Sequence, residues 1–329
     1  TDRGMLLLKE LRELDQYRLE LKPCTVILFS GGEDREGARP VILQAAEGAV
    51  LTFDEPVNLA RGQIGRLARG TLPGSVTIRS PESRPGAADQ LEVVTNNVQM
   101  TRERIETAQP ITFRYGNSYG SGRDLIIHLA LPVAKRSPGG SPAAKQRLPG
   151  VASAELVHVD RIRLQLDNPK ELAPAAAAQD RPGTPSLELE ITCQGPFKFD
   201  FERRMATFED QVDVIRVPTS GSVDQLSCQR LSVYFTQPAA SSSPPAKPSA
   251  SSAPDLRGLK VERIQAQGTP AVVLAPSYAA TLRAELFEYN FLTREVKIED
   301  RQKLMLRYQQ YDVEARQVEY QFAAGGRLG

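Results

Sequence analysis

A short pattern recurs through the last third of this 329-residue chain and constrains what the chain can fold into. Each unit is a short alternating strand, a polar turn and a second short strand, with few Gly or Pro residues inside the strands. Units of this kind occupy residues 203–235, 286–300 and 303–320. One such unit cannot bury its apolar side alone, because a single strand pair is too small to form a core. The repeat therefore predicts stacked strands with a continuous apolar lining, as in a β-solenoid, roll or slot.

The remaining segments also alternate with a period of two. Leu187, Leu189 and Ile191 take one strand parity and alternate with Glu188, Glu190 and Thr192, and residues 105–114 behave in the same way. This period marks strands with one buried face. Only residues 5–17 also admit a helical interpretation, which ranks second because the rest of the chain is rich in β signals. The sequence thus predicts an all-β protein.

Three segments are rich in Pro, Ser, Ala and Gly and interrupt the strand signals. Their apolar content is too low to offset the entropy of ordering them, so we expect them to loop out of the β framework. The predicted organisation is a β region at 1–135, a linker at 136–150, a β region at 151–236 with a polar insertion at 167–185, a linker at 237–254 and a β region at 255–329.

Composition excludes some classes of partner. The chain has 41 Lys and Arg against 40 Asp and Glu residues, which argues against a nucleic-acid binder. No run approaches the ~18 apolar residues of a transmembrane helix, and residues 1–30 lack the order of segments found in a signal peptide. We interpret the abrupt ends at Thr1 and Gly329 as those of a piece of a longer protein, whose targeting segment lies elsewhere.

The sequence offers little catalytic chemistry. Its two histidines, His128 and His158, stand in predicted strands, where packed or edge positions are commoner than a general base. The glycine-rich stretch 116–122 lacks the Lys-Ser/Thr ending of a phosphate-binding loop, and a hairpin turn with positive φ values explains it better. We therefore predict a non-enzymatic protein with no cofactor and no metal site.

The three cysteines, Cys24, Cys193 and Cys228, have no metal-ligand spacing. Cys193 and Cys228 both lie in predicted strands and could be neighbours. Buried free thiols are the preferred interpretation, and a disulfide between these two residues stays an open alternative.

The apolar parity of the strands is the remaining candidate for function. It either fills a closed core or lines a slot for acyl chains, and alternation cannot separate these, because both demand the same residue types. The candidate lining residues are Ile105, Ile111, Phe113, Phe208, Val212, Val214, Val233, Phe235, Val296, Ile298 and Leu306.

These strands resemble a known family. Residues 204–214 and 224–235 resemble the OstA-like repeat, and residues 261–272 are similar to the element that follows it. Residues 89–95, 105–113 and 120–125 resemble the related LptC-type periplasmic domain. The resemblance covers about half of the chain, and Asp210-Gln211 stands where the family has a glycine.

The resemblance implies a fold, a ligand and a location. It implies an open, twisted β-jellyroll whose apolar interior accepts the acyl chains of lipopolysaccharide or a similar amphiphile. It also implies a periplasmic protein of the cell envelope, part of a bridge between membranes that associates with other OstA-like proteins or further copies of itself through edge strands. The rival hypothesis is a purely structural scaffold with a closed core.

Two regions are candidate assembly edges, because a terminal strand leaves one side of its backbone unpaired. At the C-terminal end the predicted edge carries Val313, Val318, Tyr320 and Phe322. At the N-terminal end the candidates are residues 6–14 or 17–21.

Overall fold

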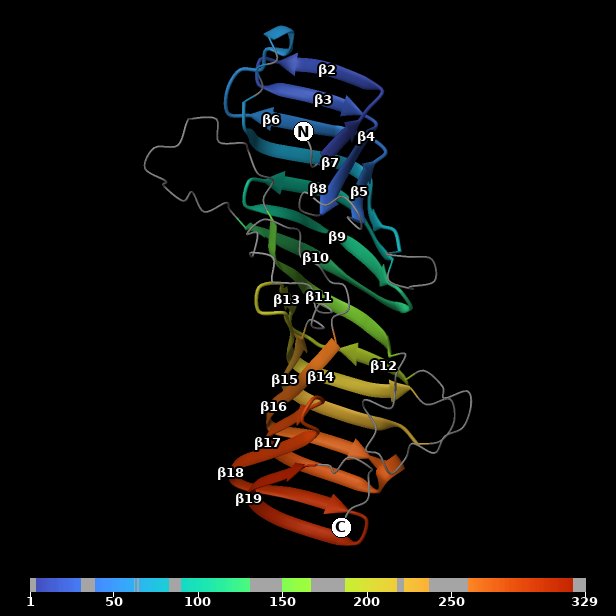
Figure 1. Cartoon of the computed structure of the whole chain (residues 1–329), viewed down its shortest axis with the longest axis vertical. Coiled ribbons are helices and arrows are strands. Elements are labelled where there is room, and N and C mark those ends of the chain that lie inside the picture. Colours follow the sequence, from blue (N-terminus) through green and yellow to red (C-terminus); the bar gives the residue numbers. More distant parts are fainter. Residues whose placement is uncertain are drawn as a thin grey trace, which may run out of the picture. The chain divides into compact units, whose positions relative to one another are not determined.

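The computed structural model describes residues 4–30, 39–61, 63, 65–82, 90–130, 150–166, 187–217, 222–236 and 260–321. The protein is all-β, as predicted, and its strands form a large antiparallel sheet (Figure 1). No helix among these residues is long and apolar enough to cross a membrane. The predicted insertion 167–185 and linker 237–254 lie outside the described residues, as does linker 136–150 apart from Gly150.

The chain forms two compact units. Unit 1 comes from residues 4–116 and 123–155, and unit 2 from residues 117–122, 156–236 and 260–321, wherever these are described. Unit 1 contains β1 (Gly4–Leu7), β2 (Glu10–Asp15), β3 (Arg18–Lys22), β4 (Cys24–Ser30), β5 (Arg39–Ala45), β6 (Ala49–Phe53), the 3₁₀ turn η1 (Leu59–Arg61), β7 (Leu67–Ser80), β8 (Leu91–Thr101) and β9 (Arg104–Tyr115). β10 (Ser118–Ala130) and β11 (Gly150–Leu166) contribute residues to both units. Unit 2 also contains β12 (Leu187–Thr192), β13 (Phe197–Asp200), β14 (Met205–Val217), β15 (Asp224–Thr236), β16 (Lys260–Ala275), the 3₁₀ turn η4 (Pro276–Tyr278), β17 (Ala280–Asn290), β18 (Glu295–Tyr308) and β19 (Tyr311–Gln321).

Unit 1 is built on β7, whose two halves pair with different strands. The first half pairs with β6 and the second half with β5. β6 continues to β3 and β2, whereas β5 continues to β4 and β1. Figure 1 shows β4 and β5 running at a steep angle to β2, β3 and β6. The sheet is thus divided into two arms that diverge from the middle of β7.

Side chains from both arms meet in one buried cluster. Leu21 of β3 and Ala49 of β6 pack with Cys24 of β4 and Ala45 of β5, and Val76 of β7 is fully buried among them. Burial of this apolar surface stabilises the unit by about 25 cal/mol per Å². The cluster explains why the arms face each other, because each arm alone would leave its apolar side in water.

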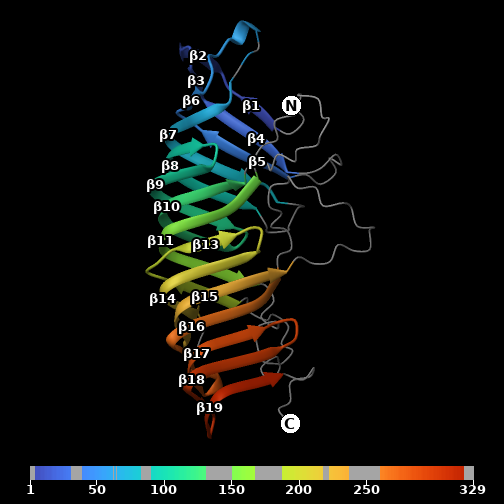
Figure 2. The ribbon, with the colours of Figure 1, turned by 90° about the vertical axis from the view of Figure 1, so that its left-hand side faces the viewer.

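Unit 2 repeats this design with longer strands. β12 and β13 pair with successive halves of β14, so together they act as one strand interrupted at residues 193–196. β14 to β19 then follow as an antiparallel meander, seen in Figure 2 as successive rungs. Each neighbouring pair in this meander has a register shift near the middle of the strands.

The register shifts of β8 and β14 coincide with left-handed backbone conformations. Asp210 and Gln211, at the β14 shift, have φ values of 58° and 46°. Asn97, at the β8 shift, has φ 51° and its side chain accepts a hydrogen bond from the Gly74 N–H at 2.9 Å. Left-handed residues and an unequal count across the pair are the features of β-bulges, which bend a strand. In these two strands the bend therefore has a local cause in the backbone.

The structure confirms one of the local sequence-based predictions and corrects three others. Residues 5–17 form strands β1 and β2, so the preferred strand interpretation is confirmed over the helical one. In the stretch 116–122 only Gly116 has a positive φ, 57°, because strand β10 already begins at Ser118. Residues 17–21 are not an edge, since β3 pairs with β2 on one side and β6 on the other. Cys193 lies just after β12 rather than in a strand.

Candidate functional site

The candidate site is the apolar face of unit 2, to which each of β14 to β19 contributes four side chains. Two rows run across the strands next to the register shifts, and we call these the inner rows. The first inner row is Phe208, Leu231, Ala266, Phe287, Ile298 and Val318, which are successive cross-strand partners. The second is Val212, Cys228, Ala271, Ala284, Leu304 and Ala315, on the other side of the shifts.

Two further rows lie toward the ends of the strands, and we call these the outer rows. One is Ala206, Val233, Ile264, Tyr289, Val296 and Tyr320. The other is Val214, Leu226, Val273, Leu282, Leu306 and Val313. Because inner and outer positions are two apart along each strand, all four rows belong to one face of the sheet.

Burial differs systematically between these rows. On β14 to β18 the inner-row side chains are buried, with Phe287 half-buried, and Leu304 and Val212 have no exposed surface. The outer-row side chains on the same strands are half-buried, except for Ala206 and Leu282, which are buried. The apolar face is therefore closed along the register shifts and partly accessible toward the strand ends.

Aromatic rings concentrate at one end of this face. Phe197 of β13 packs against Phe208 with a centroid distance of 4.9 Å. Phe199, the cross-strand partner of Ala206, lies 5.9 Å from Phe235 and 4.7 Å from Phe201. Phe199, Phe201 and Phe235 are all half-buried. They extend the outer row of Ala206 with large apolar surfaces that remain partly accessible.

Unit 1 has an apolar face of the same kind. One of its outer rows is Leu6, Val26, Leu43, Ile78, Val93 and Phe113, and the opposite one is Leu19, Leu51, Gly70, Met100 and Ile105. Two positions between these outer rows hold buried threonines, each two residues from an outer-row residue. Thr95 Oγ1 donates to the Pro110 carbonyl at 3.1 Å, and Thr107 Oγ1 donates to the Asn96 carbonyl at 2.7 Å. These bonds satisfy carbonyls near the register shift between β8 and β9.

The predicted lining residues are distributed over both faces. Ile105, Ile111 and Phe113 belong to unit 1, and the other eight belong to unit 2. In unit 2 the structure places Phe208 and Ile298 in one inner row, Val212 in the other, Val233 and Val296 in one outer row, and Val214 and Leu306 in the other. Phe235 lies beside Phe199. Ile111, Phe208, Val212 and Ile298 are buried, and the rest are half-buried.

The small residues of the apolar face are not among the residues predicted from the sequence. Ala266, Ala271 and Ala284 are at most 2% exposed and lie at inner-row positions. Phe199 and Leu304 were also missed. They fit a pattern of alternating apolar residues on both sides of a two- to five-residue break, but the position of each break is known only from the paired strands.

The predicted edge residues lie on β19, which among the described strands pairs only with β18. Val313 and Tyr320 are 39% and 38% exposed, and Val318 is half-buried against the cluster formed by Leu282, Ala284, Ile298 and Leu304. Phe322 lies outside the described residues.

The cysteine side chains are free thiols, in agreement with the preferred interpretation of the sequence. Cys24 and Cys228 are buried, and Cys193 is half-buried with its Sγ 3.3 Å from the Gly195 carbonyl. Burial raises the pKa of Cys193 to about 11 and that of Cys228 to about 12. These thiols are therefore protonated near neutral pH, and thiolate chemistry is disfavoured.

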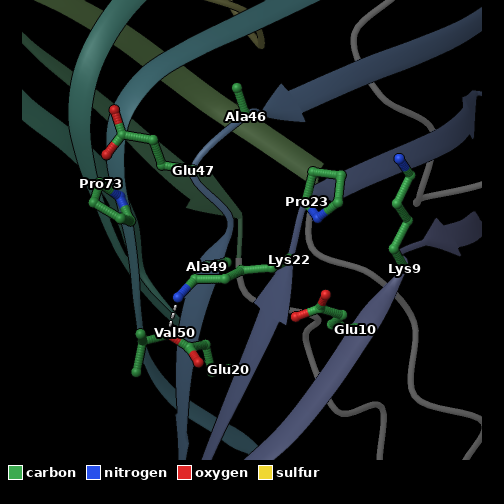
Figure 3. A pocket seen from close by; sticks show the side chains of 10 residues that line it. All are labelled: Lys9, Glu10, Glu20, Lys22, Pro23, Ala46, Glu47, Ala49, Val50 and Pro73. Atoms are coloured by element: carbon green, nitrogen blue, oxygen red, sulfur yellow. Dashed lines mark ion pairs between the residues drawn. The ribbon is translucent and has the colours of Figure 1, made fainter.

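One charged depression of about 590 Å³ lies in unit 1 (Figure 3). Its charged side chains are Lys9, Glu10, Glu20, Lys22 and Glu47, and Lys22 Nζ lies 2.6 Å from Glu20 Oε1. The depression is open and its charges are mixed in sign. Within the described residues, no group of His, Cys, Asp and Glu side chains converges in a way that could hold a metal ion. The apolar faces are thus the stronger candidate site.

Comparison with known proteins adds no relative. No protein-family model matches the chain, and neither does any curated protein or solved structure. The class that the fold and the site define is an all-β protein with a bent antiparallel meander and a partly accessible apolar face in each unit.

Proposed function

We propose that this chain is a non-enzymatic cell-envelope protein that binds or conducts lipopolysaccharide-like amphiphiles along its apolar faces. In this proposal each face is the interior of an open, twisted β-jellyroll slot, as the resemblance to OstA-like proteins implies. The protein would act in the periplasm as one segment of a bridge between membranes.

The observation that carries the proposal is the difference between inner and outer rows. A closed sandwich buries its facing side chains throughout, because the two sheets pack together at about 10 Å. Here Val214, Val233 and Val296 are apolar, face inward and are nevertheless half-buried, whereas Val212 and Leu304 beside the bend are fully buried. This gradient is what a slot with a closed floor and accessible walls requires.

Energetics show that such a slot suffices for binding. Burial of one CH₂ group stabilises by about 0.8 kcal/mol, so a 12-carbon chain gives roughly 10 kcal/mol. Lost translational and rotational freedom costs about 4–15 kcal/mol. One chain is therefore marginal, and an amphiphile with several chains, such as lipopolysaccharide, binds firmly without any polar group in the slot.

The proposed bridge also needs docking surfaces. β19 in unit 2, and β1 and β2 in unit 1, each pair on one side only among the described strands. Leu6 and Leu11 on β1 and β2 are 47% and 45% exposed. We propose that these edges add strands to other OstA-like proteins or to further copies of the chain.

Photocrosslinking tests the ligand. We would place benzoylphenylalanine singly at Phe113, Phe235 and Tyr289, which are half-buried aromatic positions, and at Met305, which is 51% exposed on the opposite strand parity. Phe208 is a poor site, because it is 3% exposed and a larger ring would disturb the floor.

The expected result is adduct formation with purified lipopolysaccharide at the three inward positions and none at Met305. Uniform failure at the inward positions would favour the structural scaffold. Equal adduct yield at Met305 would show non-specific adsorption and would also remove the proposal.

A further inference from the structure

Two turns at the same end of the unit 2 strands share one sequence pattern. Residues 199–204 read Phe-Asp-Phe-Glu-Arg-Arg, and residues 289–294 read Tyr-Asn-Phe-Leu-Thr-Arg. Both contain an aromatic residue, Asp or Asn, Phe, two further residues and Arg. The first turn joins β13 to β14 and the second joins β17 to β18, and the strand register places both at the end where the outer row of Val233 and Tyr289 lies.

The two turns also share their geometry. Asp200 Oδ1 accepts a hydrogen bond from the Arg203 N–H at 2.9 Å, and Asn290 Oδ1 accepts one from the Thr293 N–H at 3.0 Å. Phe199 and Phe201 pack at a centroid distance of 4.7 Å, and Tyr289 and Phe291 at 4.6 Å. In each turn, therefore, a side-chain oxygen accepts a backbone hydrogen bond and two aromatic rings pack against each other.

Arginine is an unfavourable residue at the last position of both turns. Arg204 and Arg294 have φ values of 50° and 56°, in the left-handed region. Glycine adopts this conformation without a steric cost, and asparagine does so at a lower cost than arginine. Ala279 and Gln309 adopt the same conformation in other turns of unit 2, so the conformation belongs to the turn. The recurrence of arginine, rather than glycine, in two turns of one sequence pattern points to a role for its side chain.

The guanidinium groups of these two residues have no ionic partner in the described part of the chain. Arg203 is paired with Asp200 at 3.8 Å, but Arg204 and Arg294 lie within 4 Å of no carboxylate there. The Glu295 carboxylate instead accepts a hydrogen bond from Thr293 Oγ1 at 3.2 Å. Both arginines are therefore available to an external anion.

Arg294 also lies close to the apolar face. Arg294 comes two residues before Val296, the cross-strand partner of Tyr289. Burial raises the pKa of Tyr289, and the positive charge of Arg294 opposes this shift. Tyr289 belongs to an outer row. An anion held by Arg294 would consequently stand at the end of the apolar face, beside aromatic rings that tolerate both apolar and polar surroundings.

We propose that Arg204 and Arg294 bind the phosphate group of an amphiphile whose chains lie on the apolar face. Arginine suits this role, because its planar fork matches phosphate oxygens. The turns are four strand spacings apart, about 19 Å, so they provide two separate phosphate contacts. The inference rests on the proposed function and adds the chemical class of the headgroup.

The test compares two ligands with the same chain. Dodecyl phosphate and dodecyl maltoside, both below their micelle-forming concentrations, are titrated calorimetrically into the full chain. Wild type should bind the phosphate more tightly than the maltoside. Arg204→Gln with Arg294→Gln should weaken phosphate binding about tenfold and leave maltoside binding unchanged. Arg301→Gln removes one positive charge from a 90% exposed side chain on β18 and should change the binding of neither ligand.

Glycine variants separate binding from folding. Arg204→Gly with Arg294→Gly should raise the midpoint of urea unfolding, because glycine relieves the backbone, and should still lose the preference for phosphate. Lower stability in this variant would show that the arginines serve the fold, and would overturn the inference.

The remaining outcomes are also decisive. Wild type that binds neither ligand would overturn the phosphate site, because two arginine contacts should make even one chain bind detectably, whereas crosslinking with lipopolysaccharide decides the proposed function. Wild type that binds both equally, or a loss in Arg301→Gln equal to that in the double glutamine variant, would overturn the phosphate site alone. Binding of inorganic phosphate as tight as that of dodecyl phosphate would show that the turns take free phosphate rather than a lipid headgroup.

Discussion

Leu304→Ala provides the sharpest test of the bent meander. Leu304 has no exposed surface, lies in an inner row and packs with Leu282, Ala284 and Ile298. Replacing a buried leucine with alanine removes its transfer free energy and leaves a cavity, which together cost about 2–5 kcal/mol. Because Leu304 lies in an inner row, where neighbouring strands on both sides restrict collapse of the cavity, we expect a loss of about 3 kcal/mol in the free energy of unfolding.

The matched control is Met305→Ala, one residue further along β18. Met305 is 51% exposed and has the opposite strand parity, so its truncation should cost about 0.5 kcal/mol or less. The contrast between these two neighbours depends entirely on the register of β18 with β17 and β19.

Urea unfolding followed by far-ultraviolet circular dichroism gives the measurement. With a slope of about 2 kcal/mol per molar urea, Leu304→Ala should lower the midpoint by about 1.5 M and leave the slope unchanged. If the two units unfold in separate transitions, only the transition of unit 2 should move. Equal losses for Leu304→Ala and Met305→Ala, or a larger loss for Met305→Ala, would refute the assignment of the inner rows.

Two further predictions concern the bulge of β14 and the edge of unit 2. Gln211→Gly should stabilise the protein by about 1 kcal/mol, because a φ of 46° has a steric cost for glutamine and none for glycine. The control Gln267→Gly, in strand β16, should destabilise the protein by about as much. Thermal unfolding of both variants measures the difference, and a loss of stability in Gln211→Gly would contradict the prediction. Val313→Lys with Tyr320→Lys should reduce self-association in sedimentation, since charges on a strand edge oppose docking, and Gln317→Lys on the opposite parity should have less effect. A wild-type chain that is monomeric at high concentration would remove β19 as an edge for self-docking.

The sequence by itself determined the fold class and much of the apolar parity. A period of two needs only the local chain, because successive side chains of any strand point to opposite faces. This is why alternation alone assigns Val214, Ile298 and Leu306 to one apolar set.

The tertiary structure alone decided how these strands combine. Local parity cannot reveal where a bulge interrupts a strand, because a bulge is defined against the partner strand. Ala266 and Ala271 were therefore missed, although both lie on the floor at opposite sides of a register shift. Burial likewise depends on what faces a residue across the bend, and so no sequence pattern separates fully buried Val212 from half-buried Val214. The two positions have the same residue type and the same parity, and they differ only in their distance from the line along which the sheet is bent.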